Sequence, residues 1–208
     1  MPDSGGANRE PRYNESMKPN RTRYFSLALP ASLALFFVST LFGYSLGKST
    51  IARKDSCVRR ELRYEVSGGS LEPILSQGQH VNVRERYYDC NPVRRGDLVT
   101  LFYAGKLAPL VKIAKGIPGD AFALIKEKDG GNWNMEINGR TLKNSLGEPY
   151  LVDIRGKNIL SLYERDYGGK IPENTYLLLG NLASAEGSLD SRNFGLVNKS
   201  DFIGIAVR

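Results

Sequence analysis

The chain has 208 residues, of which 25% are charged and 41% hydrophobic, and its formal net charge is +7. This length suits one ordinary domain and excludes a large multidomain enzyme. Residues 1–60 hold ten Lys or Arg and four acidic residues, whereas 61–208 is almost neutral, with 19 basic and 18 acidic residues. Because the basic excess flanks an apolar segment, it suits lipid head groups better than nucleic acid. Two cysteines and one histidine are too few for the usual four-ligand structural zinc site.

The first predicted element is an apolar segment over residues 24–47, which contains no charged residue. About 20 apolar helical residues span a bilayer core, so we expect one transmembrane anchor. The alternative is a removed secretory signal, whose apolar region is shorter, at about 7–15 residues. We expect residues 1–23 to form a disordered cytoplasmic tail and 48–60 a juxtamembrane linker. Both flanks carry five basic residues, so the positive-inside rule leaves the orientation open.

Residues 61–208 have the texture of a mainly β domain. Short runs rich in β-branched and aromatic residues occur at 80–85, 97–103, 110–114, 134–138, 176–180 and 202–207. Turn formers separate these runs, and Asn138-Gly139 is typical of a tight hairpin. The pattern contains no repeat and predicts no long amphipathic helix.

Cys57 and Cys90 allow two interpretations. In an oxidising compartment they would form a disulfide between the linker and the domain, and otherwise they are two separate thiols. The single histidine, His80, lies in a polar turn, where we expect a surface side chain. A Ser-His-Asp triad would have to use it.

The segment Ser67-Gly68-Gly69-Ser70 combines a serine with two preceding glycines. Glycines let a backbone approach closely and leave amides free to bind a developing oxyanion. The alternative is an ordinary Gly-Ser turn between strands.

Lys112 stands inside an apolar run that reads as a buried strand and ends at Pro118-Gly119-Asp120. Loss of hydration lowers the pKa of a buried lysine, so that the neutral amine can act as a general base near neutral pH. The alternative is a side chain that extends to solvent. We expect Lys115, three residues later on the opposite face, to be solvated.

A polar loop follows the run at 176–180. It contains Ser188, Asp190 and Arg192, of which the last two are the right types for a charge-assisted clamp. Such a loop would orient an active lysine or simply hydrogen-bond to itself.

In this order, behind an apolar anchor, these segments resemble the type I signal peptidases, membrane-bound serine–lysine peptidases that remove signal peptides. Ser70-Leu-Glu-Pro-Ile-Leu75 resembles the family's box Ser-Met-x-Pro-Thr-Leu. Arg95-Gly-Asp-Leu-Val99 resembles its Gly-Asp-hydrophobic box, and Lys112 stands eight residues before Asp120, as in its lysine box. Ser188 to Gly195 resembles the closing box Ser-x-Asp-Ser-Arg-aromatic-Phe-Gly.

The resemblance implies a role for each site residue. Ser70 would be the nucleophile and Lys112 its general base, while Ser188 would hold the lysine, and Asp190 and Arg192 would brace the loop. The oxyanion hole would use backbone amides near Gly68, Gly69 and Ser70. An extended substrate would pair with strand edges at Val66–Gly68 and Pro109–Val111, and small residues before the cut would fit shallow apolar pockets. No cofactor or metal is implied.

The resemblance also implies a fold and a location. The domain over 61–208 would have a coiled β-sheet like that of signal peptidases and follow one transmembrane helix. It would lie on the periplasmic side of a bacterial inner membrane. The partners would be exported precursors with signal peptides and the lipid bilayer, with no nucleic acid. Secretion or pilus-assembly proteins are candidate partners, and a dedicated propilin or conjugative-transfer substrate is a candidate specialisation.

The chain departs from the family pattern at several positions. Leu71 replaces a methionine, Ile113 stands where an arginine often follows the lysine, and Gly68 replaces the serine of some members. The box Gly-Asp-Asn-Arg is reduced to Gly180-Asn181-Leu182, with a longer run before Ser188. This change leaves the geometry of the outer loop open.

Two further functions remain as alternatives. A self-cleaving repressor shares a serine–lysine core, but carries a DNA-binding helical module where this chain has a tail and an anchor. A membrane-tethered β scaffold in a secretion or pilus assembly, with a relic site, would explain the altered final box.

Overall fold

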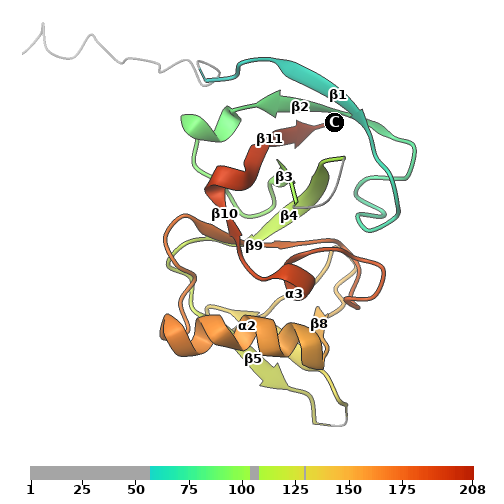
Figure 1. Ribbon diagram of the computed structural model, residues 1–208. Coiled ribbons are helices and arrows are strands. Elements are labelled where there is room, and N and C mark those ends of the chain that lie inside the picture. The colour runs from blue at the N-terminus through green and yellow to red at the C-terminus, as the bar shows by residue number, and fades with distance from the viewer. Residues whose placement is uncertain (1–56, 104–107, 129) are drawn as a thin grey trace, which may run out of the picture. The chain divides into compact units, whose positions relative to one another are not determined.

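The computed structural model describes residues 57–103, 108–128 and 130–208 (Figure 1). All described residues belong to one compact unit within Ile51–Arg208. The predicted tail, the anchor at 24–47 and most of the linker lie outside the described residues. Within the described part, no helix is both long enough and apolar enough to cross a membrane.

The larger sheet contains seven strands in the described part of the chain, and all neighbours are antiparallel. In sheet order they are β1 (Glu61–Glu65), β2 (His80–Glu85), β11 (Phe202–Val207), β3 (Leu98–Leu101), β4 (Leu110–Gly116), β9 (Thr175–Leu179) and β10 (Val197–Asn198). The C-terminal strand β11 therefore lies between β2 and β3 (Figure 1). Of two short 3₁₀ helices, η1 (Tyr87–Asp89) follows β2 and η2 (Lys199–Asp201) directly precedes β11.

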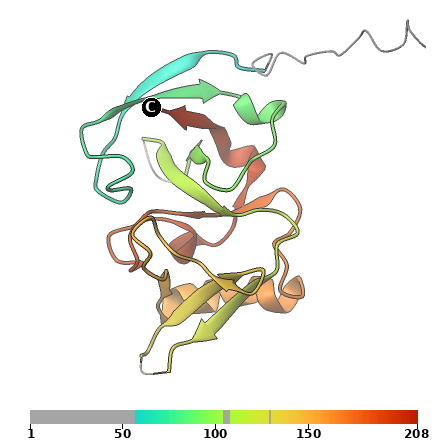
Figure 2. The same ribbon diagram turned by 180° about the vertical axis from the view of Figure 1, so that it is seen from behind.

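The smaller sheet consists of β5 (Phe122–Lys126), β6 (Trp133–Ile137), β7 (Arg140–Thr141) and β8 (Leu151–Val152). Helix α2 (Ile154–Asp166) lies behind β5 and β6 in Figure 2. Leu160 of α2 and Met135 of β6 are fully buried in one cluster with Leu177 and Leu179 of β9. Strand β9 of the larger sheet therefore supplies part of the smaller sheet's core.

The prediction of a mainly β domain is confirmed. Each of the six predicted runs overlaps a strand of the larger sheet or β6. The hairpin at Asn138-Gly139 is also confirmed, because β6 and β7 pair across it, Ile137 against Arg140. Both turn residues have positive φ, 53° and 71°, as a tight two-residue hairpin requires.

The prediction of no long amphipathic helix is wrong over residues 154–166. Asp153 caps the helix by accepting a hydrogen bond from the Gly156 amide at 2.8 Å, and within α2 only Gly156 and Leu160 are buried. So few apolar positions give a weak periodic signal, and the helix depends on packing against the sheet rather than on its own pattern. A second, one-turn helix, α3 (Ser191–Phe194), forms inside the predicted polar loop.

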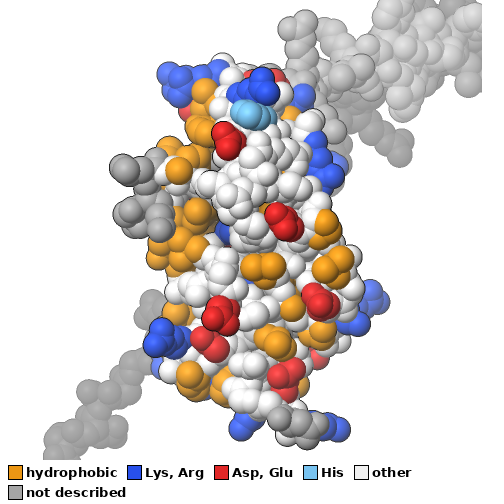
Figure 3. Space-filling model, turned by 90° about the vertical axis from the view of Figure 1, so that its right-hand side faces the viewer, with side chains coloured by type: hydrophobic (Ala, Val, Ile, Leu, Met, Phe, Trp, Pro, Cys, Tyr) orange, Lys and Arg blue, Asp and Glu red, His pale blue; other side chains and the backbone are white. Residues whose placement is uncertain are grey.

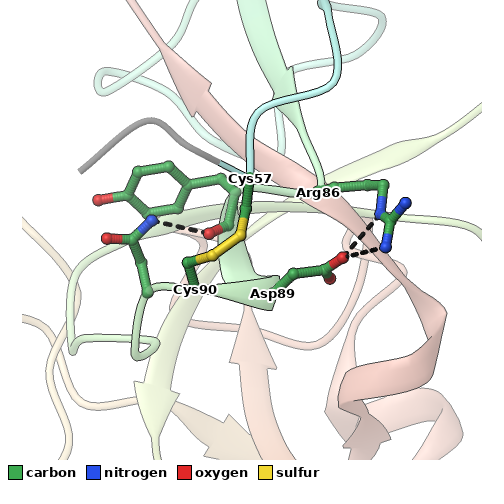
Figure 4. Close-up of a disulfide and its surroundings, with 6 residues drawn as sticks. Cys57, Arg86, Asp89 and Cys90 are labelled. Atoms are coloured by element: carbon green, nitrogen blue, oxygen red, sulfur yellow. Dashed lines mark hydrogen bonds and ion pairs between the residues drawn. A yellow bond between two sulfur atoms is a disulfide. The ribbon is translucent and has the colours of Figure 1, made fainter. Parts of the chain in front are cut away.

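A disulfide joins Cys57 to Cys90, with 5.8 Å between their Cα atoms (Figure 4). Cys57 precedes β1 and Cys90 follows η1, so the bond ties the start of the described chain to the end of a helical turn. The same turn is held by an ion pair between Arg86 and Asp89 and by a hydrogen bond from Asn91 Nδ2 to the Tyr87 carbonyl (Figure 4). Of the two interpretations of these cysteines, the structure has the bonded one.

We expect the double variant Cys57→Ser/Cys90→Ser to lose about 2–4 kcal/mol of unfolding free energy, because a crosslink restricts the unfolded chain. The two cysteines are 33 residues apart in the sequence. Thermal denaturation of the wild type with and without reductant measures the same loss, and the double variant serves as the control that reductant leaves unchanged. Equal melting temperatures for all four samples would contradict the bond.

Candidate active site

Ser70 lies in the turn that joins β1 to β2, and we call residues 67–75 the nucleophile turn. Leu71 and Leu75 anchor the turn in the core, with exposed fractions of 3% and 0%. The Leu75 amide donates to the Leu71 carbonyl at 3.1 Å. Gly68 has φ of +83°, in the region that glycine adopts without strain. Two apolar side chains and one permissive glycine therefore present Ser70 at the surface of the core.

Lys112 reaches Ser70 from β4, which β11 and β3 separate from β2 in the order of the sheet. Its Nζ donates a hydrogen bond to Ser70 Oγ at 2.8 Å. Its strand, β4, is buried on both faces, because Ile113 and Ala114 belong to different apolar clusters. Lys112 itself is only 3% exposed. The structure thus brings the predicted nucleophile and the predicted base into direct contact, 42 residues apart in sequence.

Burial is the main influence on the pKa of Lys112 and lowers it from its ordinary value. The Asp190 carboxylate acts in the opposite direction, and the Arg192 guanidinium lowers the pKa further. Because Arg192 is paired with Asp190, the nearest carboxylate cannot fully stabilise the charged ammonium. The amine is therefore biased toward its neutral form.

Asp190 and Arg192 form an ion pair at 2.8 Å whose side chains are both 0% exposed. The Asp190 carboxylate also accepts hydrogen bonds from the Gly180 amide at 2.9 Å and from Ser188 Oγ at 2.7 Å. Burial acts to raise the pKa of Asp190, but the hydrogen bonds and charge of Arg192 outweigh it, so that the pKa lies below its ordinary value. The predicted clamp is present, and it organises the whole closing loop.

Ser188 is placed differently from the role that the resemblance implies. Its hydroxyl donates to Asp190, and within the described part of the chain no hydrogen bond joins it to Lys112. A direct hold on the lysine remains a prediction. Ser188 is linked to Lys112 only indirectly. It hydrogen-bonds to the Asp190 carboxylate, and the charge of this carboxylate acts on the pKa of Lys112.

The reduced box at Gly180-Asn181 keeps close contact with the nucleophile turn. The Asn181 amide donates to the Ser70 carbonyl at 2.6 Å. A Cβ on Gly180 would lie 2.4 Å from Ser188 Oγ and 2.7 Å from the Ser70 carbonyl oxygen, so only glycine fits between the two. The longer run before Ser188 therefore leaves the contact with Ser70 intact.

Two other motifs brace the far end of β4. Arg95 makes a two-pronged ion pair with Asp120, which is 6% exposed and also accepts from Asn138 Nδ2 at 3.0 Å. The Arg95 guanidinium additionally donates to the Lys115 carbonyl at 3.1 Å. The Gly-Asp box and the Pro-Gly-Asp turn thus meet and fix the strand that carries Lys112.

A cleft of about 360 Å³ opens beside Ser70 and Lys112. It is lined mainly by residues 64–71 and 108–112, with Val81, Thr100, Gly187 and Leu189. Strand β9 pairs with β4 only from Ile113 onward, so in the described chain the β4 edge at Val111 is open on that side. This edge is suited to an extended peptide.

The prediction for Val66 needs a correction. Its amide already donates to the Gln79 carbonyl and its carbonyl accepts from the Gly78 amide, both at 2.8 Å. Val66 is 9% exposed and lines the cleft, so it contributes a side chain rather than a free strand edge. The backbone at the expected oxyanion hole differs from that of Val66, because among the described residues the Ser70 amide has no hydrogen-bond acceptor.

Sequence reasoning missed Tyr150 and misjudged Lys115. Tyr150 is fully buried and its hydroxyl donates to the Gly180 carbonyl at 2.8 Å. Lys115, expected in solvent, is partly buried, lies over the Tyr150 ring at 5.1 Å and donates to the Lys143 carbonyl. The only signal in the sequence for a buried Tyr150 is that an aromatic residue follows a proline within a polar stretch.

The His, Cys, Asp and Glu side chains in the described part of the chain do not line the cleft at Ser70 and Lys112, apart from Glu65. His80 is exposed at the start of β2 and is the pale blue side chain in Figure 3. On that face acidic and basic side chains are interspersed (Figure 3). Among the described residues, no group of three or more His, Cys, Asp or Glu side chains is placed to hold a metal ion. The arrangement suits hydrolysis by a serine and a lysine rather than by a histidine triad.

Comparisons with known proteins identify a peptidase family. Residues 59–208 match the family model described as signal peptidase, peptidase S26. A signal peptidase I of Bacillus caldolyticus is 31% identical over 144 residues, which cover 68% of this chain and 74% of that protein. Signal peptidase I P of Bacillus subtilis subsp. natto is 30% identical over 144 residues, covering 68% and 72%.

Solved structures match the chain as well. One of them is a signal peptidase I from Enterococcus faecalis V583, with 22% identity and a TM-score of 0.39, and the match covers 55% of this chain and 97% of that one. The family assignment rests on the sequence comparisons.

The buried ion pair gives a stability prediction. We expect Arg192→Leu to lower the unfolding free energy by about 3–5 kcal/mol, because it leaves the Asp190 charge buried without a partner. The matched control is Arg165→Leu, which breaks a pair with Asp166 whose side chains are 71% and 48% exposed, and we expect no measurable change there. Chemical denaturation measures both, and equal losses would contradict the burial of the Asp190–Arg192 pair.

Proposed function

Because the chain belongs to the signal peptidase family, peptidase S26, we propose that it removes N-terminal signal peptides from exported precursors with Ser70 as nucleophile and Lys112 as general base. The chain is a serine endopeptidase of the signal peptidase I type. One observation supports the assignment of the dyad above the others. It is the 2.8 Å hydrogen bond between Lys112 Nζ and Ser70 Oγ inside a largely buried site.

In the proposed first step, the neutral Lys112 amine takes the proton of the Ser70 hydroxyl as Ser70 Oγ attacks the scissile carbonyl carbon. The tetrahedral intermediate carries a negative oxygen. The Ser70 amide, which has no acceptor within the described residues, is suited to donate to this oxygen. The Lys112 ammonium then returns its proton to the leaving amine, and the peptide bond breaks.

In the second step, water attacks the Ser70 ester. Lys112 Nζ takes a proton from the water, the acyl C–O bond breaks, and the proton passes to Ser70 Oγ. This step regenerates the free serine and the neutral amine and releases the signal peptide with a new carboxylate. Proton balance therefore requires no group beyond the dyad and water.

The cleft accounts for the kind of substrate that we propose. Val66, Leu71 and Val81 give it an apolar lining, and the open edge of β4 at Val111 would hold the precursor in an extended conformation. Its volume of about 360 Å³ is at the lower end for ligand pockets, which suits small side chains before the cut, such as Ala-x-Ala.

Proteins of this family act at membranes, and we propose a single anchor at residues 24–47 with the domain outside the cytoplasm of a bacterial cell. The uncharged apolar segment supports the anchor, and the Cys57–Cys90 disulfide supports an oxidising compartment. Carbonate extraction of membranes and protease treatment of spheroplasts test the anchor and the orientation. Recovery in the soluble fraction would contradict the anchor.

Two ranges of precursors fit this function. One is a dedicated substrate, such as a propilin or a conjugative-transfer protein, and the other is a broad set of exported precursors. Mass spectrometry of mature N-termini in cells lacking the protein separates them. One retained signal peptide marks a specialist, and many mark a general enzyme.

We expect Ser70→Ala and Lys112→Met to abolish processing of a co-expressed precursor, because each removes one half of the dyad. Immunoblotting of precursor and mature forms measures the effect, with His80→Ala as the control that keeps processing. Unchanged processing by Ser70→Ala would leave only the scaffold function. Loss in His80→Ala with retention in Lys112→Met would replace the dyad by a histidine mechanism.

The pH dependence follows from the lowered pKa of Lys112. The protonated amine cannot accept the serine proton, so kcat/KM falls as pH falls through this pKa and rises to a plateau above it. Because burial lowers the pKa, we expect this limb below the ordinary lysine value of about 10.4. Peptide cleavage measured across pH tests it, and a limb at the ordinary value would contradict a neutral buried base.

A further inference from the structure

Asn181 is a buried polar residue next to the nucleophile turn. It lies two residues after the end of β9 and is only 1% exposed. It does not line the cleft, so it does not face the proposed substrate site. A buried amide in such a place must satisfy its donors and acceptor within the protein, and its partners are informative. The inference below rests on the proposed function.

Two of its hydrogen bonds end on the nucleophile turn. The Asn181 backbone amide donates to the Ser70 carbonyl at 2.6 Å, and its side-chain Nδ2 donates to the Glu72 carbonyl at 2.7 Å. One residue thus holds two carbonyls, two positions apart, of the turn that carries the nucleophile. The bond to Glu72 connects residues 109 positions apart in sequence.

Its other hydrogen bonds end on residues 143–149, which we call the support loop. Nδ2 also donates to Ser145 Oγ at 2.8 Å, and Oδ1 accepts from the Ser145 amide at 3.0 Å. The Asn181 carbonyl accepts from Asn144 Nδ2 at 3.1 Å. The support loop follows β7 of the smaller sheet, so Asn181 joins the nucleophile turn to a second element as well as to its own strand.

The bond to the Ser70 carbonyl has a direct geometric effect. A carbonyl and the amide of the next residue share one rigid plane, so fixing this carbonyl fixes the backbone on the C-terminal side of Ser70. The Ser70 amide lies on the other side of the same Cα and is the group with no acceptor among the described residues. The hydrogen bond that holds the Ser70 carbonyl therefore leaves the Ser70 amide oriented for the oxyanion.

We propose that Asn181 is a positioning residue of the reaction, which holds the nucleophile turn so that Ser70 Oγ stays against Lys112 and the Ser70 amide faces the developing oxyanion. The neighbouring glycine makes this contact possible, since a Cβ on Gly180 would lie 2.7 Å from the Ser70 carbonyl oxygen. Asparagine supplies what the place requires, two N–H donors and one acceptor on a short side chain. Aspartate has the same shape but lacks both donors.

Two substitutions test the proposal in the full-length chain, purified in detergent, with a peptide that spans an Ala-x-Ala cleavage site. Asn181→Asp keeps the volume and removes the donors to Glu72 and Ser145, and Asn181→Ala removes the whole side-chain amide. Both retain the backbone amide that binds the Ser70 carbonyl, so they test the part of the hold that the side chain supplies. We expect kcat to fall about 10- to 100-fold in both, because a displacement of about 1 Å costs about 100-fold. KM should change less than about 3-fold, since Asn181 lies outside the cleft.

Asn144→Ala is the matched control. Asn144 is also buried, at 7% exposure, and hydrogen-bonds within the support loop and to the Asn181 carbonyl, but not to the nucleophile turn. Its loss should lower the melting temperature while kcat, normalised to the folded fraction from circular dichroism, stays within about 2-fold of the wild type. A merely structural role for Asn181 predicts the same behaviour in all three variants.

The outcomes are distinct. A fall in kcat at Asn181 with KM retained and Asn144→Ala normal supports the proposal. Wild-type kcat in folded Asn181→Asp, an equal fall in Asn144→Ala, or a change confined to KM overturns it. If Asn181→Ala does not fold, the isosteric Asn181→Asp carries the comparison. Wild type and Ser70→Ala in the same assay report on the proposed function separately, because failure of the wild type to cleave would refute that function itself.

Discussion

The amine of Lys112, held in the interior of a sheet, is the constraint on which the surrounding structure depends. An ammonium loses most of its hydration there, because β4 is buried on both faces and Lys112 is only 3% exposed, with its contact to solvent limited to the cleft beside Ser70. Most of the motifs around it serve this placement. The Arg95–Asp120 pair fixes the end of the strand, and the apolar anchors of the nucleophile turn bring Ser70 onto the amine.

A buried carboxylate beside that amine would normally return it to the charged form. Asp190 is close enough to Lys112 to influence its pKa, yet the carboxylate is bound by Arg192, Ser188 and the Gly180 amide. Its hydrogen-bonding capacity is directed to these partners. The closing loop therefore supplies both partners of the Asp190–Arg192 ion pair. Lys112 lies next to this pair without forming an ion pair of its own with Asp190. This separation distinguishes the site from a simple buried salt bridge.

Local pattern predicted most of the strands, whereas the choice of Ser70 and Lys112 depended on the resemblance of four ordered motifs to a known family. β3, β4 and β11 are short, apolar and bounded by turn formers, and β2 alternates apolar and polar residues. A lysine inside a strand such as β4 is conspicuous, but its pattern alone left a solvent-exposed side chain open. The features that sequence reasoning missed depend on partners. Strand β1 (ELRYE) is rich in charges because it lies at the sheet edge, and α2 has only two buried residues. The hydrogen bonds of Val66 and Asn181 connect segments whose proximity exists only after folding, and no local spacing encodes them.

The position of β11 has a consequence for folding. This strand contains residues 202–207, yet it separates β2 from β3 in the sheet. The β1–β2 hairpin that carries the nucleophile turn and the β3–β4 pair that carries Lys112 therefore join in one sheet only through a strand that lies far from both in the sequence. Such distant pairing slows folding. The contact between Ser70 and Lys112 consequently depends on this long-range pairing and not on either hairpin alone.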